Sequence, residues 1–256
     1  MKRPPAILRR RDELEALYLR YADRRYLSPD PLELVWEFDD PGDREAVALM
    51  AASLSYGRVA QILASARKVL RLLGASPAAA LLDAPPGAWA KPLAGFQHRW
   101  TRGADVAGLL DGIGAVLRRH GSLEACFAAG QPVDAPDILP GLEHLVRAIG
   151  PCGGLLSDPA KPGAHKRLLM FMRWMARRDV IDPGVWSAVP AAKLLVPLDT
   201  HMFRECRALG LTRRRQPGMP ACLEITARFR LLSPADPVKY DFALTRKGIR
   251  GAIPGG

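Results

Sequence analysis

The chain has 256 residues, of which 48% are hydrophobic and 25% charged, and its formal net charge at pH 7 is +11. This composition is globular and excludes an intrinsically disordered protein. No apolar run approaches the roughly 20 residues that span a bilayer, and the basic N-terminal segment lacks the apolar stretch of a secretion signal. Residues 1–150 hold 19 basic and 18 acidic side chains, whereas residues 151–256 hold 18 and 8. The basic excess therefore belongs to the C-terminal part, which favours an acidic partner such as nucleic acid.

Apolar residues recur at helical spacing along most of the chain, and no alternating β-branched segment of strand length is present. We therefore predict an all-α fold, with Asp43 as the N-cap of the second helix. The irregular segment 82–104 is expected to be an ordered, packed loop because it carries Trp89, Phe96 and Trp100. The predicted helices lie at 13–21, 44–54, 59–73, 105–118, 121–129, 136–149, 164–178, 200–209, 219–231 and 236–249.

The cysteines lack the spacing of a metal site or a disulfide framework, and no C-x-x-C pair is present. We predict buried, reduced thiols in a cytoplasmic protein. The five histidines also lack ligand spacing, so no metal and no cofactor is expected. The four cysteines are Cys126, Cys152, Cys206 and Cys222.

Two segments carry candidate chemical groups. In the first, Pro197 precedes Asp199, which stands directly before a helical pattern. Aspartate is a preferred N-cap residue, so helix capping alone explains this position. In the second, the turn at Pro162 and Gly163 leads into a helix whose first turn holds Lys166.

A lysine in the first turn of a helix is disfavoured by the helix dipole, and Arg167 beside Lys166 adds like charge. Both effects favour the neutral amine, which is the form that attacks in Schiff-base chemistry. A solvated lysine, or one that binds phosphate, explains the same position. From spacing alone, both interpretations stay open.

Residues 199–204, with the sequence D-T-H-M-F-R, resemble the D-T-H-x-F-R signature of the helix-hairpin-helix DNA glycosylases, the endonuclease III-like superfamily. The stretches PLDTHMFRECRALGLTRRR, HKRLLMFMRWMARRD and DPVKYDFALTRKGI are more similar to a bacterial family of unknown function within that superfamily. The resemblance extends from about Asp43 to the C-terminus. It implies that Asp199 is the essential carboxylate. It also implies one two-lobed helical domain over 1–256, in which 30–150 form a six-helix-like lobe, and 1–29 and 151–256 form the lobe with the hairpin.

The hairpin pattern of the superfamily, L-P-G-x-G-x-K, is similar to residues 161–167, K-P-G-A-H-K-R, with His165 at the second glycine. An ungapped match places Arg167 at the nucleophile position, but an arginine does not deprotonate in proteins. Archaeal 8-oxoguanine glycosylases have a longer separation before the aspartate and a lysine that opens a helix, which Lys166 resembles. The resemblance therefore implies Lys166 as the nucleophile, with Lys161 as the alternative. The four-cysteine iron–sulfur loop is absent after Asp199, so no cluster is expected.

The function that the resemblance implies is base-excision repair of DNA by a glycosylase with Schiff-base lyase activity, acting on a damaged or modified base flipped from the duplex. The alternatives are a non-catalytic nucleic-acid-binding protein on the same scaffold and an unrelated all-α protein that mimics the motif. We expect a monomer in the bacterial cytoplasm, associated with the nucleoid and not with a membrane. The DNA contacts implied are Gly163, His165, Arg167, Arg173, Arg177, His201, Arg204, Arg213 and Arg214, and the implied base-pocket residues are Tyr56, Arg58, Gln97, Trp100 and Trp174.

Overall fold

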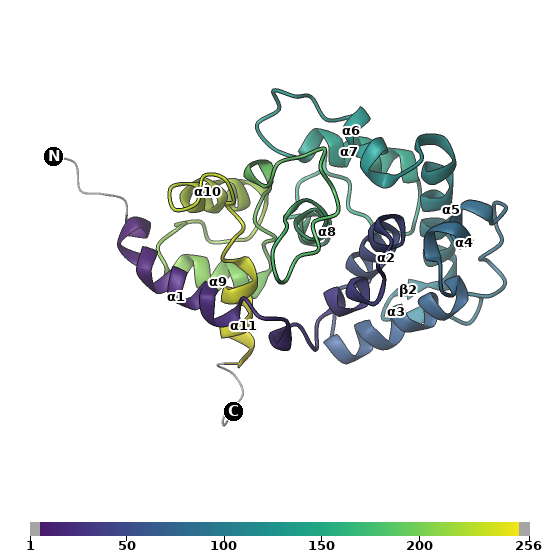
Figure 1. Cartoon of the computed structure of the whole chain (residues 1–256), viewed down its shortest axis with the longest axis horizontal. Coiled ribbons are helices and arrows are strands. Elements are labelled where there is room, and N and C mark those ends of the chain that lie inside the picture. Colours follow the sequence, from purple (N-terminus) through teal and green to yellow (C-terminus); the bar gives the residue numbers. More distant parts are fainter. Residues whose placement is uncertain (1–5, 251–256) are drawn as a thin grey trace.

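The protein is described by a computed structural model that covers residues 6–250, with side chains from 7 to 246. Helices dominate this part of the chain, which confirms the all-α prediction (Figure 1). The helices are α1 (Arg11–Tyr21), α2 (Pro41–Ser53), α3 (Val59–Leu73), α4 (Pro77–Asp83), α5 (Gly103–His120), α6 (Leu123–Ala129), α7 (Leu139–Ile149), α8 (Lys166–Ala176), α9 (Thr200–Ala208), α10 (Met219–Arg230) and α11 (Asp241–Arg250). Four short 3-10 segments lie at Ala6–Arg10, Arg24–Tyr26, Pro31–Glu37 and Ala191–Lys193.

Most predicted helices are present, with ends that differ by a few residues. The seven-residue helix α4 was not predicted, nor was the small hairpin in which β1 (Gln97–His98) pairs antiparallel with β2 (Thr101–Arg102). Both elements are too short to show a periodic pattern in the sequence. The segment around the hairpin is packed through Trp89 and Phe96, which are buried as predicted, but Trp100 is 67% exposed.

The predicted N-cap of α2 was wrong. Asp40, not Asp43, precedes Pro41 at the first helical position, and its carboxylate accepts the N–H of Asp43 at 2.9 Å. Proline at this position begins a helix readily, since its missing N–H would have no intrahelical partner. The Asp43 carboxylate instead accepts the N–H of Ala78 at 2.7 Å, and so joins α2 to the start of α4.

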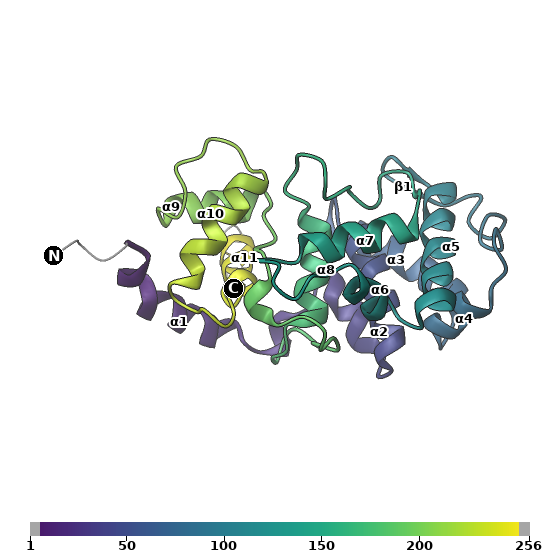
Figure 2. The same cartoon turned by 90° about the horizontal axis from the view of Figure 1, so that it is seen from above.

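The helices gather at two ends of the molecule. Helices α1, α9, α10 and α11 lie at one end, α3, α4 and α5 lie at the other, and α8 lies between them (Figures 1 and 2). Helix α8 packs closely against α2, while α11 packs against α1 and α9. The central position of α8 brings its residues close to elements that lie far apart in the sequence. The division into two lobes at the predicted boundaries stays a prediction.

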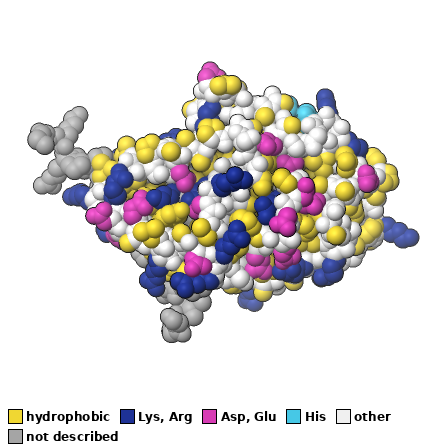
Figure 3. All heavy atoms as spheres, viewed as in Figure 1, with side chains coloured by type: hydrophobic (Ala, Val, Ile, Leu, Met, Phe, Trp, Pro, Cys, Tyr) yellow, Lys and Arg dark blue, Asp and Glu magenta, His cyan; other side chains and the backbone are white. Residues whose placement is uncertain are grey.

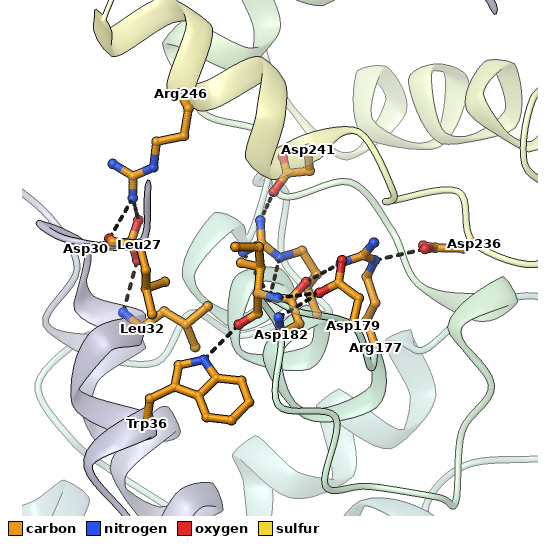
Figure 4. Close-up of polar contacts among 12 residues, drawn as sticks. Leu27, Asp30, Leu32, Trp36, Arg177, Asp179, Asp182, Asp236, Asp241 and Arg246 are labelled. Carbon is orange, nitrogen blue, oxygen red and sulfur yellow. Dashed lines mark hydrogen bonds and ion pairs between the residues drawn. The ribbon is translucent and has the colours of Figure 1, made fainter. Parts of the chain in front are cut away.

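A buried ion-pair network fixes α8 to the loop that follows it and to the start of α11. Arg173 contacts Asp182 at 3.1 Å and also pairs with Asp241, while Arg177 contacts Asp182 at 2.7 Å (Figure 4). Arg177 also binds Asp179 and Asp236. Two guanidinium groups thus face four carboxylates. Breaking a buried pair of this kind by removing one partner is strongly destabilising, because the other charge stays buried.

The four cysteines are all buried and unpaired, as predicted. Between residues 6 and 250, no helix combines the length and the apolar character that a membrane-spanning helix needs.

Candidate active site

A cavity of about 820 Å³ lies where α8, α11 and the segment that leads into α9 meet the turn between α2 and α3. A further wall is the segment 28–31, which leads into the 3-10 turn at Pro31–Glu37. A volume of this size falls within the range of small-molecule binding pockets. The lining includes three carboxylates and three cations: Asp30, Asp199, Asp241, Lys166, Arg173 and Arg246.

Lys166 and Asp199 meet at this cavity, each at the start of a helix. Lys166 is the first residue of α8, and its Nζ lies 3.7 Å from Oδ2 of Asp199. Asp199 is the N-cap of α9, where its Oδ1 accepts the N–H of Met202 at 2.8 Å. Both side chains are about one-third exposed (33% and 32%). The pair is therefore fixed in place by two helix termini but open to a ligand.

The turn before Lys166 has an unusual backbone. His165 adopts a left-handed conformation with a φ of 44°, which glycine reaches most easily. The strain is offset by its buried ring, in which Nδ1 lies 2.9 Å from Ser157 Oγ and Nε2 lies 3.0 Å from the carbonyl oxygen of Lys161. The ring also lies beside Gly163, close to the space that a Cβ at this position would need. The His165 side chain thus stabilises the turn and does not face solvent, so any contact of this residue with phosphate must come from its backbone N–H.

The alternative nucleophile, Lys161, lies outside the cavity. Its side chain is 78% exposed, and its Nζ is 3.8 Å from Asp158. Arg167, at the ungapped nucleophile position, turns toward the end of α2, where its guanidinium donates to the carbonyl oxygen of Ser53 at 2.6 Å. It also donates to Gly154 at 3.0 Å and lies over the ring of Tyr56. Of Lys161, Lys166 and Arg167, it is Lys166 whose side chain lies beside Asp199.

The predicted contact of Arg173 and Arg177 with DNA was wrong. Both side chains lie in the buried network and are 7% and 5% exposed, and their guanidinium groups already face carboxylates, although Arg173 also contributes to the cavity wall. Their side of α8 faces the loop that follows the helix, through Asp182, and the start of α11, through Asp241 (Figure 4). Arginine is seldom buried unless it is paired, and here the carboxylates supply the pairing.

The other predicted DNA contacts are more accessible. His201 and Arg204 are exposed on α9, and Arg204 Nη2 lies 3.2 Å from His201 Nδ1. Arg213 and Arg214 are exposed in the loop before α10, where Arg214 pairs with Glu224 at 3.2 Å. The face shown in Figure 3 carries lysine and arginine interspersed with acidic side chains, without one continuous basic patch.

Two of the five predicted base-pocket residues, Tyr56 and Trp174, line the cavity. Arg58, Gln97 and Trp100 are exposed and do not line it. Trp100 stacks on the outer side of the site, with its ring centroid 4.7 Å from that of Tyr56 and an interplanar angle of 20°. The Tyr56 hydroxyl bonds to Thr101 Oγ1 at 2.5 Å, and so holds the β1–β2 hairpin beside the cavity.

Three charged residues of the cavity were not predicted. Asp30 and Arg246 pair with each other at 2.5 Å and join the segment 28–31 to α11 (Figure 4). Asp241 opens α11 and lies against Arg173. Burial raises the pKa of the Asp241 carboxyl to about 6, although Arg173 opposes the shift. Only Asp241 and Arg246 had a signal in the sequence, because they lie in a stretch that carried the family resemblance.

The fold and the site define an all-α protein with a lysine–aspartate pair on the wall of a large cavity. The chain belongs to a family described as "Protein of unknown function (DUF2400)", which matches residues 30–250. No curated protein and no solved structure gives a significant match.

Proposed function

We propose that the protein is a DNA glycosylase of base-excision repair, with the helix-hairpin-helix fold that its sequence resembles and with Schiff-base lyase activity. The observation that carries the proposal is the 3.7 Å separation between Lys166 Nζ and Asp199 Oδ2 on the cavity wall. A nucleophilic amine beside a carboxylate, next to a pocket large enough for a base, is what this chemistry needs.

The hairpin geometry supports the proposal. Position 165 corresponds to the second glycine of the superfamily hairpin, and the residue there has the left-handed backbone that a glycine would adopt. The three side-chain and backbone contacts of the His165 ring explain how a larger residue is accommodated at that position. The chain then enters α8 with Lys166 as its first residue.

The reaction follows from the two side chains. Asp199 takes a proton from the Lys166 ammonium, and the free amine attacks C1′ of a flipped nucleotide. The new C–N bond forms as the bond to the base breaks, and Asp199 gives the proton that it took from Lys166 to the departing base, which restores the carboxylate. The carboxylate also stabilises the positive charge that develops on the sugar. Opening of the sugar ring gives the Schiff base, and β-elimination removes a C2′ proton and breaks the C3′–O bond.

The charge distribution supports a polyanionic substrate. The buried network uses four of the eight acidic residues of 151–256, but only two of the eighteen basic ones. Outside the network, the basic residues of 151–256 therefore outnumber the acidic ones by a larger margin than the composition of this segment suggests. The first N–H groups of α8 lack intrahelical partners and point toward the turn at 163–165, where a phosphate is favoured.

The test is borohydride trapping on a duplex that contains an abasic site. We expect a covalent adduct with the wild-type protein, loss of the adduct in Lys166→Ala, and its retention in the matched control Lys161→Ala. A panel of damaged bases in the same duplex then measures base release. No adduct and no base release with any lesion, together with salt-dependent DNA binding, would overturn the enzymatic proposal in favour of a non-catalytic DNA-binding protein.

A further inference from the structure

The tip of the β1–β2 hairpin presents an aromatic ring to solvent. A two-residue turn joins the strands, and it consists of Arg99, whose φ of 54° lies in the left-handed region, and Trp100. Glycine is usual at the first position of such a turn, so an arginine adopts this backbone at a cost. Trp100 is 67% exposed and is the most exposed of the five tryptophans. The turn therefore holds an indole away from the core.

The indole rests on a rigid support. Its ring stacks on that of Tyr56, with centroids 4.7 Å apart and an interplanar angle of 20°. The Tyr56 hydroxyl contacts the carbonyl oxygen of His98 at 3.0 Å and Thr101 Oγ1 at 2.5 Å, and the Arg167 guanidinium lies 5.2 Å from the Tyr56 ring centroid. The His98 ring is buried and binds the carbonyl oxygen of Tyr56 in return, at 3.0 Å. These contacts hold the Trp100 ring in one orientation before any ligand arrives.

The outer face of the indole is open. Because Tyr56 covers one face of the Trp100 ring, an exposed fraction of 67% requires that much of the opposite face meets solvent. Single exposed apolar side chains are common on folded proteins and need no function. This one differs because a network of buried and half-buried groups fixes its orientation. A fixed aromatic face that is open on one side is the surface on which a nucleobase stacks.

The surroundings of the hairpin are basic. The segment 56–104 contains seven lysine and arginine residues and one acidic residue. Arg58, Arg99 and Arg102 are exposed, and the guanidinium carbon of Arg99 lies 4.9 Å from the centroid of the Trp100 ring. Cations beside an aromatic platform are typical of surfaces that bind single-stranded nucleic acid, since the cations bind phosphates and the ring binds bases. The charge around Trp100 therefore suits a polyanion.

We propose that Trp100 stacks on an unpaired base of bound DNA, and that DNA with unpaired nucleotides is therefore the substrate class. The proposal rests on the proposed function for the identity of the ligand as DNA. Tyr56 lines the cavity and Trp100 does not, so the stacked base is a different one from the base held in the cavity. In an intact duplex each base is covered by its neighbours, and a base step must be broken before the indole can stack. A single strand offers its bases without this cost.

The test measures DNA binding by fluorescence anisotropy with two labelled strands of equal length. One is an oligothymidylate, and the other has tetrahydrofuran in place of every deoxynucleoside, so it keeps the phosphates and lacks the bases. We expect Trp100→Ala to bind the oligothymidylate about tenfold more weakly and the baseless strand as the wild type does. The slope of log binding constant against log salt should stay unchanged, because stacking releases no counterions.

A third DNA tests the preference for unpaired nucleotides. On the duplex of the same oligothymidylate with oligoadenylate, Trp100→Ala should weaken binding by less than it does on the single strand, because the bases of the duplex are stacked on each other. An equal or larger loss on the duplex would overturn the assignment of the substrate class.

Two control variants accompany Trp100→Ala. Trp100→Phe keeps an aromatic face and should retain most of the affinity for the oligothymidylate. Leu19→Ala removes a side chain that is 72% exposed on α1, at the other end of the molecule, and should change no affinity (Figures 1 and 2). Wild-type affinity of Trp100→Ala for the oligothymidylate, or an equal loss on the baseless strand, would overturn the proposal.

Binding needs no bond cleavage, so this experiment separates the two proposals. Borohydride trapping by a protein whose DNA binding is insensitive to Trp100→Ala refutes only the stacking contact. A loss of affinity in Trp100→Ala that depends on the bases, without trapping or base release, refutes only the glycosylase chemistry.

Discussion

Asp199 uses its two carboxylate oxygens for different tasks: Oδ1 caps α9 through the Met202 N–H, and Oδ2 faces Lys166 Nζ at 3.7 Å. Capping orients the carboxylate, since a bonded oxygen at a helix terminus restricts the side-chain rotamer. The structural role and the proposed chemical role therefore need not compete for the residue. Two substitutions of Asp199 separate these roles, because one removes the negative charge and keeps the helix cap, whereas the other removes both.

Asp199→Asn should retain the fold and lose the chemistry. Asparagine caps helices as well as aspartate does, so we expect a change in the free energy of unfolding below about 0.5 kcal/mol. The missing charge should lower the rate of base release by about 10²–10³-fold, which is typical of removing one electrostatic contact from a transition state. Denaturant unfolding and single-turnover kinetics measure the two effects.

Asp199→Ala is the matched comparison, because it removes the cap as well. It should unfold more easily than Asp199→Asn by about 1 kcal/mol and be equally inactive. An Asn variant that releases base at the wild-type rate would show that the negative charge plays no part.

His165→Gly should be more stable than His165→Ala. Both substitutions remove the ring contacts with Ser157 and Lys161, so their difference isolates the backbone. Alanine in a left-handed conformation costs roughly 1–2 kcal/mol, whereas glycine adopts a φ of 44° without this penalty. We expect His165→Gly to have the higher melting temperature by about 3 °C. Equal melting temperatures would mean that the turn relaxes out of this conformation.

The sequence predicted the fold class and the elements that carry the Lys166–Asp199 pair, because helical periodicity is a local property and the D-T-H motif lies at a helix start. It did not reveal which charges are buried. Arg173 belongs to a cluster with Arg177 and Arg178 that favoured a DNA-binding face, and its partner Asp241 is 68 residues away. Burial of a cation is decided by such distant partners, which no local pattern contains. The same reason explains why Asp30 was missed.

The arginines should therefore divide into two classes on substitution. Arg173→Ala leaves Asp182 and Asp241 buried with too few cations, and should lower the free energy of unfolding by about 3–5 kcal/mol. Arg213→Ala, on the exposed loop, should change it by less than about 0.5 kcal/mol. If Arg213 binds a phosphate, its loss should reduce the slope of log binding constant against log salt by about 1. Denaturant unfolding and salt-dependent DNA binding distinguish the two classes, and a mild effect of Arg173→Ala on unfolding would contradict the network as described.

Asp241 should make the stability depend on pH in an unusual direction. Burial raises its pKa from 3.8 to about 6, and the carboxylates of Asp182 and Asp199 add to the shift against the opposing charge of Arg173. The folded protein thus holds a proton that the unfolded chain has released, so this stabilisation is complete below pH 3.8 and is lost as the pH rises through 6. The shift corresponds to a contribution of up to about 3 kcal/mol. The amide of Asp241→Asn does not titrate, so the free energy of unfolding of the wild type should fall relative to that of this variant between pH 4 and pH 7. Urea unfolding at each pH measures the difference. A difference that is constant or rises over this range would show that the carboxyl is ionised throughout.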